Sequence, residues 1–407
     1  MLMSRFDFLK IATMGMGALG FAAAKAAASA AGGPLEKAQA EAARLKITGV
    51  DIHPYDLPLK SPFRIAIGTM PAANDVLVRI HTDAGITGTG EACPFPPITG
   101  ETQETNLAAA KALREIVLGR NPLAVESLTR EFGAIVHSNP SATAAFDTAL
   151  FDILGKIAGL PLFRLLGGDR TSFATDITVD LDEPETMARR AREFVAAGFD
   201  IIKIKVGQGQ DLDLRRLEAV RAAVGPEVTL QIDANQGWAP PVAIDTLRKM
   251  ERFNILFVEQ PVLASDFDSL RAVKTASPIP VMADEAAFGP ADVVKLVKAE
   301  ACDYVNIKLM KAGGLANMSK MAHIAEGANM ACMVGCMLES RLALTAAAHI
   351  VGAHRNILWT DLDGHTSHTV DPVTDGMTFA KGRITLPEKP GIGAEVDPAF
   401  LKTLKKI

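Results

Sequence analysis

The residues of this sequence that could carry out chemistry lie in five short motifs, each at the end of an apolar segment. The motifs are KIK (203–205), IDAN (232–235), VEQP (258–261), ADE (283–285) and NIK (306–308). Lysines can act as general acids and bases, and carboxylates can hold a divalent cation. These residue types in this order predict a site for metal-assisted proton transfer.

The carboxylates of Asp233, Glu259 and Asp284 end three successive apolar segments, so neighbouring parallel strands would bring them together. Three buried negative charges repel one another and lose hydration, which is costly unless a cation lies among them. Oxygen ligands with room for water and substrate suit Mg²⁺. We therefore predict that these residues bind Mg²⁺. Structural salt bridges with nearby lysines are the alternative.

Three predicted strands lie between those of Lys205 and Lys308, so the two lysines would approach the metal from opposite sides. A lysine needs a pKa well below its usual ~10.4 to act as a base near neutral pH. Lys203, on the same strand face as Lys205, and the cation would both lower that pKa. One lysine could remove a proton alpha to a metal-held carboxylate, and the other could return a proton to the opposite face of the enediolate.

The elements that must position these residues are predicted from the spacing of the motifs. Strand ends recur roughly every 24 to 28 residues, about one strand plus one helix, and the same rhythm predicts strand ends near Asp180, Gly335 and Asp361. Eight strands alternating with helices predict an α/β fold with a closed (β/α)8-type barrel over residues 171–363. An open doubly wound sheet is the alternative.

A separate α+β domain is predicted ahead of the barrel, over residues 46–170. Residues 46–92 alternate in short apolar and polar runs around a turn signal at Asp83-Ala84-Gly85, and helical patterning follows. The last segment, 364–407, is expected to return to this domain.

The composition is typical of a globular enzyme and argues against several other classes of protein. The 407 residues carry a net charge of -5 and no basic block, so we expect no nucleic-acid partner. The four cysteines (Cys93, Cys302, Cys332 and Cys336) are too few and too scattered for a disulfide framework, and we expect them to be small core residues.

Residues 1–30 are predicted to be an export signal, and residues 31–45 a linker. Two basic residues precede an apolar stretch, and Ala28-Ser29-Ala30 fits a cleavage site. The stretch is shorter than the ~20 residues of a membrane-spanning helix, so no stable membrane anchor is expected. The leader resembles a twin-arginine signal, with Phe6 where the second arginine belongs, and predicts a periplasmic location. A disordered or anchoring N-terminus is the alternative.

Longer versions of the five motifs, KIKVG, QIDANQGW, FVEQP, MADE and NIKLMKAGG, resemble the enolase superfamily in its muconate-lactonizing-enzyme subgroup. The resemblance implies a modified (β/α)7β barrel with an N-terminal capping domain, and assembly into dimers or octamers. It also implies that Lys205 and Lys308 form an acid/base pair beside Mg²⁺, a mechanism characteristic of that superfamily. Lys203 would adjust the pKa of Lys205 and face the substrate carboxylate.

Asp361 and Asp363, at the end of the predicted eighth strand, could hold a substrate ammonium group. Within the subgroup, this Asp-x-Asp and the stretch GEACPFPPITGET resemble the dipeptide epimerases, which bind the free amino group of a dipeptide and invert its C-terminal residue. We therefore expect a small dipeptide substrate. The alternative is that the two aspartates cap the next helix.

The choice of dipeptide is expected to depend on two lid loops rich in Pro, Gly and Thr, Ser61 to Met70 and Cys93 to Glu101, although ordinary surface turns are an alternative. Arg64 could pair with the side-chain carboxylate of glutamate in Ala-Glu, or it could be solvated. The sequence therefore does not choose between an acidic and a hydrophobic dipeptide as the substrate.

Three other reactions of the subgroup compete with epimerisation: N-acylamino acid racemisation, o-succinylbenzoate synthesis and muconate cycloisomerisation. Their substrates lack a free ammonium group, so a requirement for Asp361 and Asp363 would separate them from dipeptide epimerisation. A competitor of another class is an exported peptide-binding protein, for which Lys205 and Lys308 would be dispensable.

Overall fold

The structure is a computed structural model that describes residues 34–407. The chain divides into two units at residue 45, and residues 46–407 form the second, compact unit. In the first unit the structure describes helix α2 (Pro34–Arg44), which occupies most of the predicted linker. The predicted export signal, residues 1–30, lies outside the described residues. Among the described residues, no helix is both long enough and apolar enough to cross a membrane.

The second unit begins with an antiparallel sheet. Strand β1 (Ile47–Ile65) pairs with β2 (Gly68–Thr82), and β2 pairs with β3 (Thr87–Ala92) across the predicted turn at Asp83-Ala84-Gly85. The helices that follow are α3 (Pro96–Thr99), α4 (Gln103–Val117), α5 (Val125–Ile135), α6 (Pro140–Ala158) and α7 (Leu162–Leu165). The expected α+β capping domain is confirmed.

Two glycines in β3 let helix α6 pack directly against this sheet. A Cβ atom at Gly88 would lie 2.0 Å from the carbonyl oxygen of Ala149, and one at Gly90 would lie 2.0 Å from that of Ala145. Only a residue without a side chain fits at such a close approach. The TGTG run is therefore a buried strand despite its low apolar content.

Within residues 46–407, eight parallel strands form a second sheet in the order of the sequence. They are β5 (Ile177–Val179), β6 (Ile201–Lys205), β7 (Thr229–Asp233), β8 (Ile255–Glu259), β9 (Val281–Ala283), β10 (Tyr304–Lys308), β11 (Ala331–Gly335) and β12 (Ile357–Asp361). Each strand ends at or next to a predicted strand end, because each short apolar run is long enough for one buried strand.

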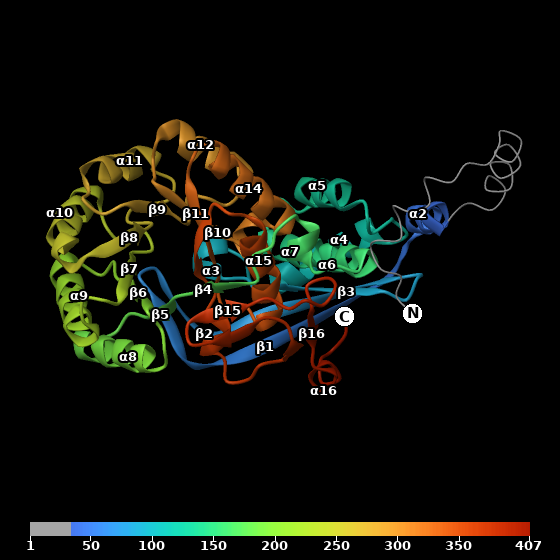
Figure 1. Ribbon diagram of the computed structural model, residues 1–407, viewed down its shortest axis with the longest axis horizontal. Helices are drawn as coiled ribbons and strands as arrows, with labels where there is room; N and C mark the ends of the chain where they lie inside the picture. The colour runs from blue at the N-terminus through green and yellow to red at the C-terminus, as the bar shows by residue number, and fades with distance from the viewer. Residues whose placement is uncertain (1–33) are drawn as a thin grey trace, which may run out of the picture. The chain divides into compact units, whose positions relative to one another are not determined.

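Within the described part of the chain, seven longer helices connect these strands, and Figure 1 shows them on the outside of the ring of strands. They are α8 (Pro184–Ala196), α9 (Gln210–Val224), α10 (Pro240–Met250), α11 (Phe267–Ala276), α12 (Pro290–Ala299), α14 (Leu315–Gly327) and α15 (Arg341–Ala353). Two shorter ones are η2 (Glu251–Phe253) and α13 (Leu309–Ala312). Eight strands with seven connecting helices agree with the (β/α)7β expectation.

The first and last strands of the ring meet through individual hydrogen bonds. The Asp176 amide, just before β5, donates to the carbonyl oxygen of Thr360 in β12 at 3.1 Å. The Thr360 hydroxyl donates to the carbonyl oxygen of Ala174 at 2.6 Å, and the Leu362 amide donates to the Thr175 hydroxyl at 3.1 Å. These contacts close the barrel, so the alternative of an open sheet is wrong.

The interior of the barrel is mostly apolar away from the carboxyl ends of the strands. The residues that fill it are Phe257, Met282 and Met333, with Tyr304 and Trp359 packed against them. Phe257 and Trp359 lie two residues before Glu259 and Asp361, so each pair shares one face of its strand. The charged side chains of the interior therefore collect at the carboxyl end of the barrel, while the uncharged Gln231 is buried deeper in it.

The C-terminal segment contacts both the barrel and the capping domain. Its elements are η3 (Gly364–Ser367), β13 (Val373–Asp375), β14 (Thr378–Ala380), β15 (Arg383–Thr385), β16 (Ala394–Val396) and α16 (Pro398–Leu401). Strand β15 pairs with β14 and with β4 (Ser172–Ala174), and the Ile407 amide donates to the carbonyl oxygen of Ile52 in β1 at 2.9 Å.

One of the two predicted lid loops is a strand hairpin. Ser61 to Met70 is the far end of β1 and β2, where Phe63 pairs with Met70 and Arg64 with Thr69. The register of the two strands shifts just before this point. The composition rich in Pro, Gly and Thr suggests a loop, but the backbone of this segment is paired. Cys93 to Glu101 is irregular except for the short helix α3.

Candidate active site

Three carboxylates converge at the carboxyl end of the barrel, as the sequence predicts. Asp233 ends β7, Glu259 ends β8 and Asp284 directly follows β9. The three strands are neighbours in the sheet, and Asp233 lies opposite Glu259 in the register. All three side chains are buried. Adjacent strands therefore supply one candidate metal ligand each.

Lys205 and Lys308 flank this group of carboxylates. Lys205 ends β6 and Lys308 ends β10, so the three carboxylate strands lie between them. Lys205 Nζ lies 2.6 Å from Asp233 Oδ2. Lys308 Nζ lies 2.9 Å from Asp284 Oδ2 and 3.9 Å from Glu259 Oε1. Both lysines line the same cavity, so one substrate could contact both.

Lys203 is the cation most closely surrounded by carboxylates. Its ammonium nitrogen lies 2.7 Å from Glu259, 2.8 Å from Asp361 and 3.1 Å from Asp233. Burial alone would lower the pKa of Lys203, but the three carboxylates raise it well above its usual value. Lys203 is therefore a fixed positive charge two residues from Lys205.

The carboxylates of the site are incompletely paired, which fits a bound cation. Glu259 Oε2 and both Asp284 carboxylate oxygens have no hydrogen-bond donor in suitable geometry, although lysine ammonium groups lie within ion-pair distance. Burial and the nearby charge of Asp233 raise the pKa of Glu259 to about 7.

Among the described residues, the site holds seven buried carboxyl groups and four buried lysines. These are Asp176, Asp233, Glu259, Asp284, Glu285, Asp361 and Asp363, with Lys203, Lys205, Lys308 and Lys311. Buried negative charge in excess is costly without a counter-ion. The excess and the oxygen-only donor set together fit Mg²⁺.

The surroundings of Lys308 favour its protonated form. Burial alone would lower the pKa of Lys308, but Asp284 and Glu259 raise it above its usual range. The protein groups alone therefore prepare Lys308 to donate a proton. To accept one near neutral pH, it needs additional positive charge at these two carboxylates.

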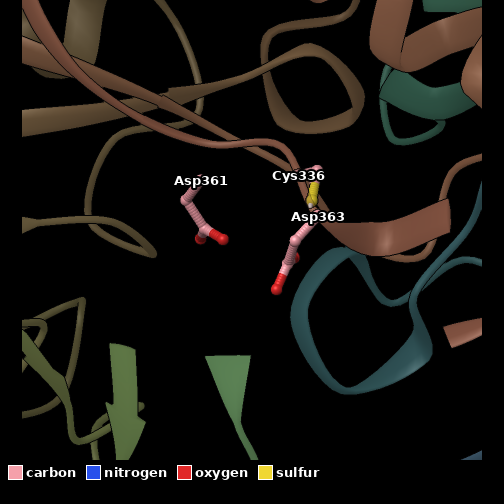
Figure 2. A group of neighbouring side chains, drawn as sticks. All are labelled: Cys336, Asp361 and Asp363. Atoms are coloured by element: carbon pink, nitrogen blue, oxygen red, sulfur yellow. Dashed lines mark hydrogen bonds between the residues drawn. The ribbon is translucent and has the colours of Figure 1, made fainter. Parts of the chain in front are cut away.

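Asp361, Asp363 and Cys336 lie side by side at the ends of the last two barrel strands (Figure 2). Their potential ligand atoms lie within 4.8 Å of one another, a spacing that could also suit a metal. However, Lys203 lies 2.8 Å from Asp361 and would repel a divalent cation twice as strongly as an ammonium group. Burial also raises the pKa of the Cys336 thiol well above its usual value. The site suits an ammonium group better than a metal.

The two aspartates do not cap a helix. Asp363 precedes the short helix η3, but its side chain makes no capping hydrogen bond and instead accepts from the Thr178 amide at 2.7 Å. Burial and the charge of Asp361 raise the pKa of Asp363 to about 6. Asp176 lies nearby, fully buried, with no hydrogen-bond donor on either carboxylate oxygen. Burial and the charges of Asp361 and Asp363 raise the pKa of Asp176 well above its usual value, so these groups form an acidic corner of the site in which Asp361 carries the firmest negative charge.

Three residues that hold the carboxylates in place were missed by the sequence analysis. Lys311 Nζ lies 2.5 Å from Asp284 Oδ1 and donates to the carbonyl oxygen of Asn306 at 3.1 Å. Gln260 accepts from the Asp284 amide at 3.0 Å, and Asn306 donates to Glu259 at 2.7 Å. Gln260 has a φ of 34°, a strained value that is typical of functional sites.

A cavity of about 30 Å³ lies between these strand ends and the capping domain. Its charged and polar side is formed by Thr178, Lys203, Lys205, Asn235, Lys308, Asp361 and Asp363. Its apolar side is formed by Phe63, Ile65, Phe95, Ile98, Cys336 and Met337. The charged strand ends therefore face an apolar wall that comes mainly from the capping domain.

Arg64 is not brought into this site. Its neighbours Phe63 and Ile65 line the cavity, and side chains alternate along a strand, so Arg64 lies on the other face of β1. Its side chain is exposed. The position of Arg64 therefore gives no support to the predicted contact with a substrate side chain. Cys336, expected to be only a core residue, does line the cavity.

Comparisons with known proteins match almost all of the second unit. Residues 47–167 match the family described as "Mandelate racemase / muconate lactonizing enzyme, N-terminal domain", and residues 186–400 match "Enolase C-terminal domain-like". A "Hydrophobic dipeptide epimerase" of Enterococcus faecalis is 40% identical, covering 86% of this chain and 99% of its own. An "L-Ala-D/L-Glu epimerase" of Clostridium acetobutylicum is also 40% identical, over 86% of this chain and 98% of its own.

A solved structure is similar over the same region. The dipeptide epimerase of Cytophaga hutchinsonii, complexed with Mg and the dipeptide D-Ala-L-Val, has a TM-score of 0.87 and 39% identity. The alignment covers 89% of this chain and 99% of that chain. The similarity therefore includes the capping domain as well as the barrel.

Proposed function

This chain belongs to the mandelate racemase and muconate lactonizing enzyme family of the enolase superfamily, and from that membership we propose that it is a Mg²⁺-dependent dipeptide epimerase. The reaction inverts the alpha carbon of the C-terminal residue of a dipeptide. The observation that carries the proposal is that Lys205 and Lys308 line one cavity from opposite sides of three carboxylates, with Asp361 and Asp363 in the same cavity.

The two lysines move the proton. One of them takes the alpha proton from the face of the carbon that it contacts, and the other, as an ammonium group, returns a proton to the opposite face. The roles exchange when the other epimer is the substrate, so both lysines are needed for inversion in either direction.

The remaining charged residues bind and orient the substrate. Asp361 and Asp363 bind the free ammonium group of the N-terminal residue, and Lys203 supplies fixed positive charge near the C-terminal carboxylate. Asp233, Glu259 and Asp284 would hold the metal. When bound, Mg²⁺ supplies positive charge that stabilises the negative charge developing on the substrate carboxylate.

The ammonium-binding aspartates favour epimerisation over the other reactions of the family. N-acylated amino acids, muconate and o-succinylbenzoate precursors carry no free ammonium group, so they would bring no positive charge to the two buried carboxylates that line the cavity. The relatives of about equal identity act on different dipeptides according to their names, so identity alone does not choose the side chain.

The proposal is tested by proton exchange in D₂O with Mg²⁺, following the C-terminal alpha proton of L,L-dipeptides by NMR. Deuterium incorporation together with formation of the L,D epimer is expected, and both should stop when the metal is chelated. Exchange on N-acyl amino acids but on no dipeptide would assign the chain to a racemase instead.

A matched variant tests the role of the aspartate pair. Asp363→Asn keeps the shape of the side chain but removes its charge, so KM for a dipeptide should rise by about tenfold or more, since hydrogen bonds to charged groups are worth more than neutral ones. An unchanged KM would remove the ammonium site from the proposal.

We also propose that the protein is exported to the periplasm and that it self-associates. The basic and apolar leader supports export, and N-terminal sequencing of the protein from a periplasmic fraction would test it. Light scattering coupled to size-exclusion chromatography would test self-association.

A further inference from the structure

We propose that the dipeptide substrate of this enzyme has an apolar, not an acidic, C-terminal side chain. The inference rests on the proposed function and adds the class of side chain, which the relatives leave open. It follows from the chemistry of the cavity wall that faces the reacting carbon.

In the part of the chain that the structure describes, the side chains that the capping domain presents to the cavity are all apolar. Phe63 and Ile65 come from the tip of the β1–β2 hairpin, and Phe95 and Ile98 come from the segment around α3. The rings of Phe63 and Phe95 lie edge to face, with centroids 6.4 Å apart, so the two segments form one continuous apolar surface. Met337 extends this surface from the barrel side.

This apolar surface lies directly beside one of the proton-transferring lysines. The Lys205 ammonium nitrogen is 5.9 Å from the centre of the Phe63 ring. The alpha carbon that exchanges its proton with Lys205 must lie within hydrogen-bond reach of that nitrogen. The strand ends are occupied by the carboxylates and lysines, so we place the side chain attached to the same carbon against the Phe63 region.

No lysine or arginine that lines the cavity, among the described residues, is free to pair with a carboxylate on that side chain. Lys203, Lys205 and Lys308 each lie within 3 Å of at least one carboxylate. Arg64 is exposed and lies on the opposite face of its strand.

The two kinds of side chain therefore differ in their cost of binding. A glutamate side chain would have to bury its charge against Phe63 and Ile98 without a counter-ion, which is unfavourable. A leucine, methionine or phenylalanine side chain would replace water at the same apolar wall, which is favourable.

The test compares L-Ala-L-Leu, L-Ala-L-Met, L-Ala-L-Gln and L-Ala-L-Glu in the NMR exchange experiment with Mg²⁺. Met, Gln and Glu have similar lengths, so the series separates polarity and charge from size. We expect kcat/KM for the Leu and Met dipeptides to exceed that for Ala-Glu by at least about tenfold. One methylene group in an apolar pocket already changes kcat/KM by about that factor.

A charge introduced into the wall should change this preference. Ile98 is only half-buried, so Ile98→Arg can be accommodated, and it should raise the Glu-to-Leu ratio of kcat/KM by about tenfold. Ile67→Arg is the matched control, because Ile67 lies on the exposed hairpin tip outside the cavity lining and should leave the ratio unchanged.

The outcomes separate the two proposals. If Ala-Glu is the best substrate of the unmodified enzyme, the inference is wrong and the epimerase assignment stands. If no dipeptide exchanges its alpha proton, the epimerase assignment fails and the inference fails with it. An equal effect of Ile98→Arg and Ile67→Arg would show that the wall does not contact the side chain, and would also overturn the inference.

Discussion

Gly335 provides the space that the end of the Lys308 side chain occupies. A Cβ atom on Gly335, at the end of β11, would lie 3.0 Å from Lys308 Cε and 2.7 Å from the side-chain amide of Asn306. Contacts this short require the neighbour to move. The neighbouring strand is therefore part of what positions the proposed base.

Replacing Gly335 should therefore impair proton transfer by Lys308, the lysine that it contacts. Gly335→Ala is expected to shift the ends of the Asn306 and Lys308 side chains and to lower kcat for epimerisation by up to about tenfold, since a full misplacement of about 1 Å can cost about a hundredfold. Gly327→Ala is the control, since a Cβ there meets nothing within 4 Å. Equal kcat values in the two variants would contradict the spatial argument.

Lys311 is expected to be essential for stability, although it does not line the cavity. It is buried, and its ammonium group pairs with Asp284 and with two backbone carbonyl oxygens. Lys311→Met leaves the Asp284 carboxylate with one partner fewer, and breaking a buried pair costs about 3–5 kcal/mol. Urea unfolding measures this loss.

A surface lysine provides the comparison for that measurement. Lys320 pairs with Glu126 but is 46% exposed, so Lys320→Met should cost about 0–1 kcal/mol. If both variants unfold at the same urea concentration, the buried pair is not a stabilising element.

Asp147 should make the stability of the fold depend on pH. It lies in α6 of the capping domain and accepts from the amides of Leu315 and Ala316 at the start of α14 on the barrel. Burial raises the pKa of Asp147 from 3.8 to about 7. Between about pH 4 and pH 7 the folded state keeps a proton on Asp147 that the unfolded state has lost. The contribution of Asp147 to stability is therefore full below about pH 4 and is lost as pH rises through about 7.

The size of this effect follows from the shift of about three pKa units, which corresponds to about 4 kcal/mol. Asp147→Asn keeps an oxygen acceptor for the Leu315 amide and removes the titration. Unfolding free energies measured from pH 4 to pH 8 should therefore fall less steeply in the variant. A steeper fall in the variant would contradict the assigned shift.

The main catalytic elements could be predicted from sequence because they depend on local patterns. Lys205, Asp233 and Glu259 each end a short apolar run, and in a parallel barrel all such ends meet at one rim. The barrel fold could be predicted from the regular spacing of these strand ends, which leaves room for one helix between successive strands.

The parts that could not be predicted depend on tertiary packing. Lys311 follows the strand end by one turn of helix, where a lysine is usually solvated, and its burial depends on how α13 packs. Whether Phe63 or Arg64 faces the cavity depends on a register shift in β1 and β2, and a slip of one residue exchanges the two faces.

The central claim, two-base inversion by Lys205 and Lys308, is tested most directly by Lys308→Ala with Mg²⁺ in D₂O. We predict that epimerisation disappears while alpha-proton exchange persists for one epimer of the dipeptide only, because Lys205 can still act on its own face. The exposed Lys298→Ala serves as the control and should behave as the unmodified enzyme does. Unchanged epimerisation by Lys308→Ala would contradict the two-base account.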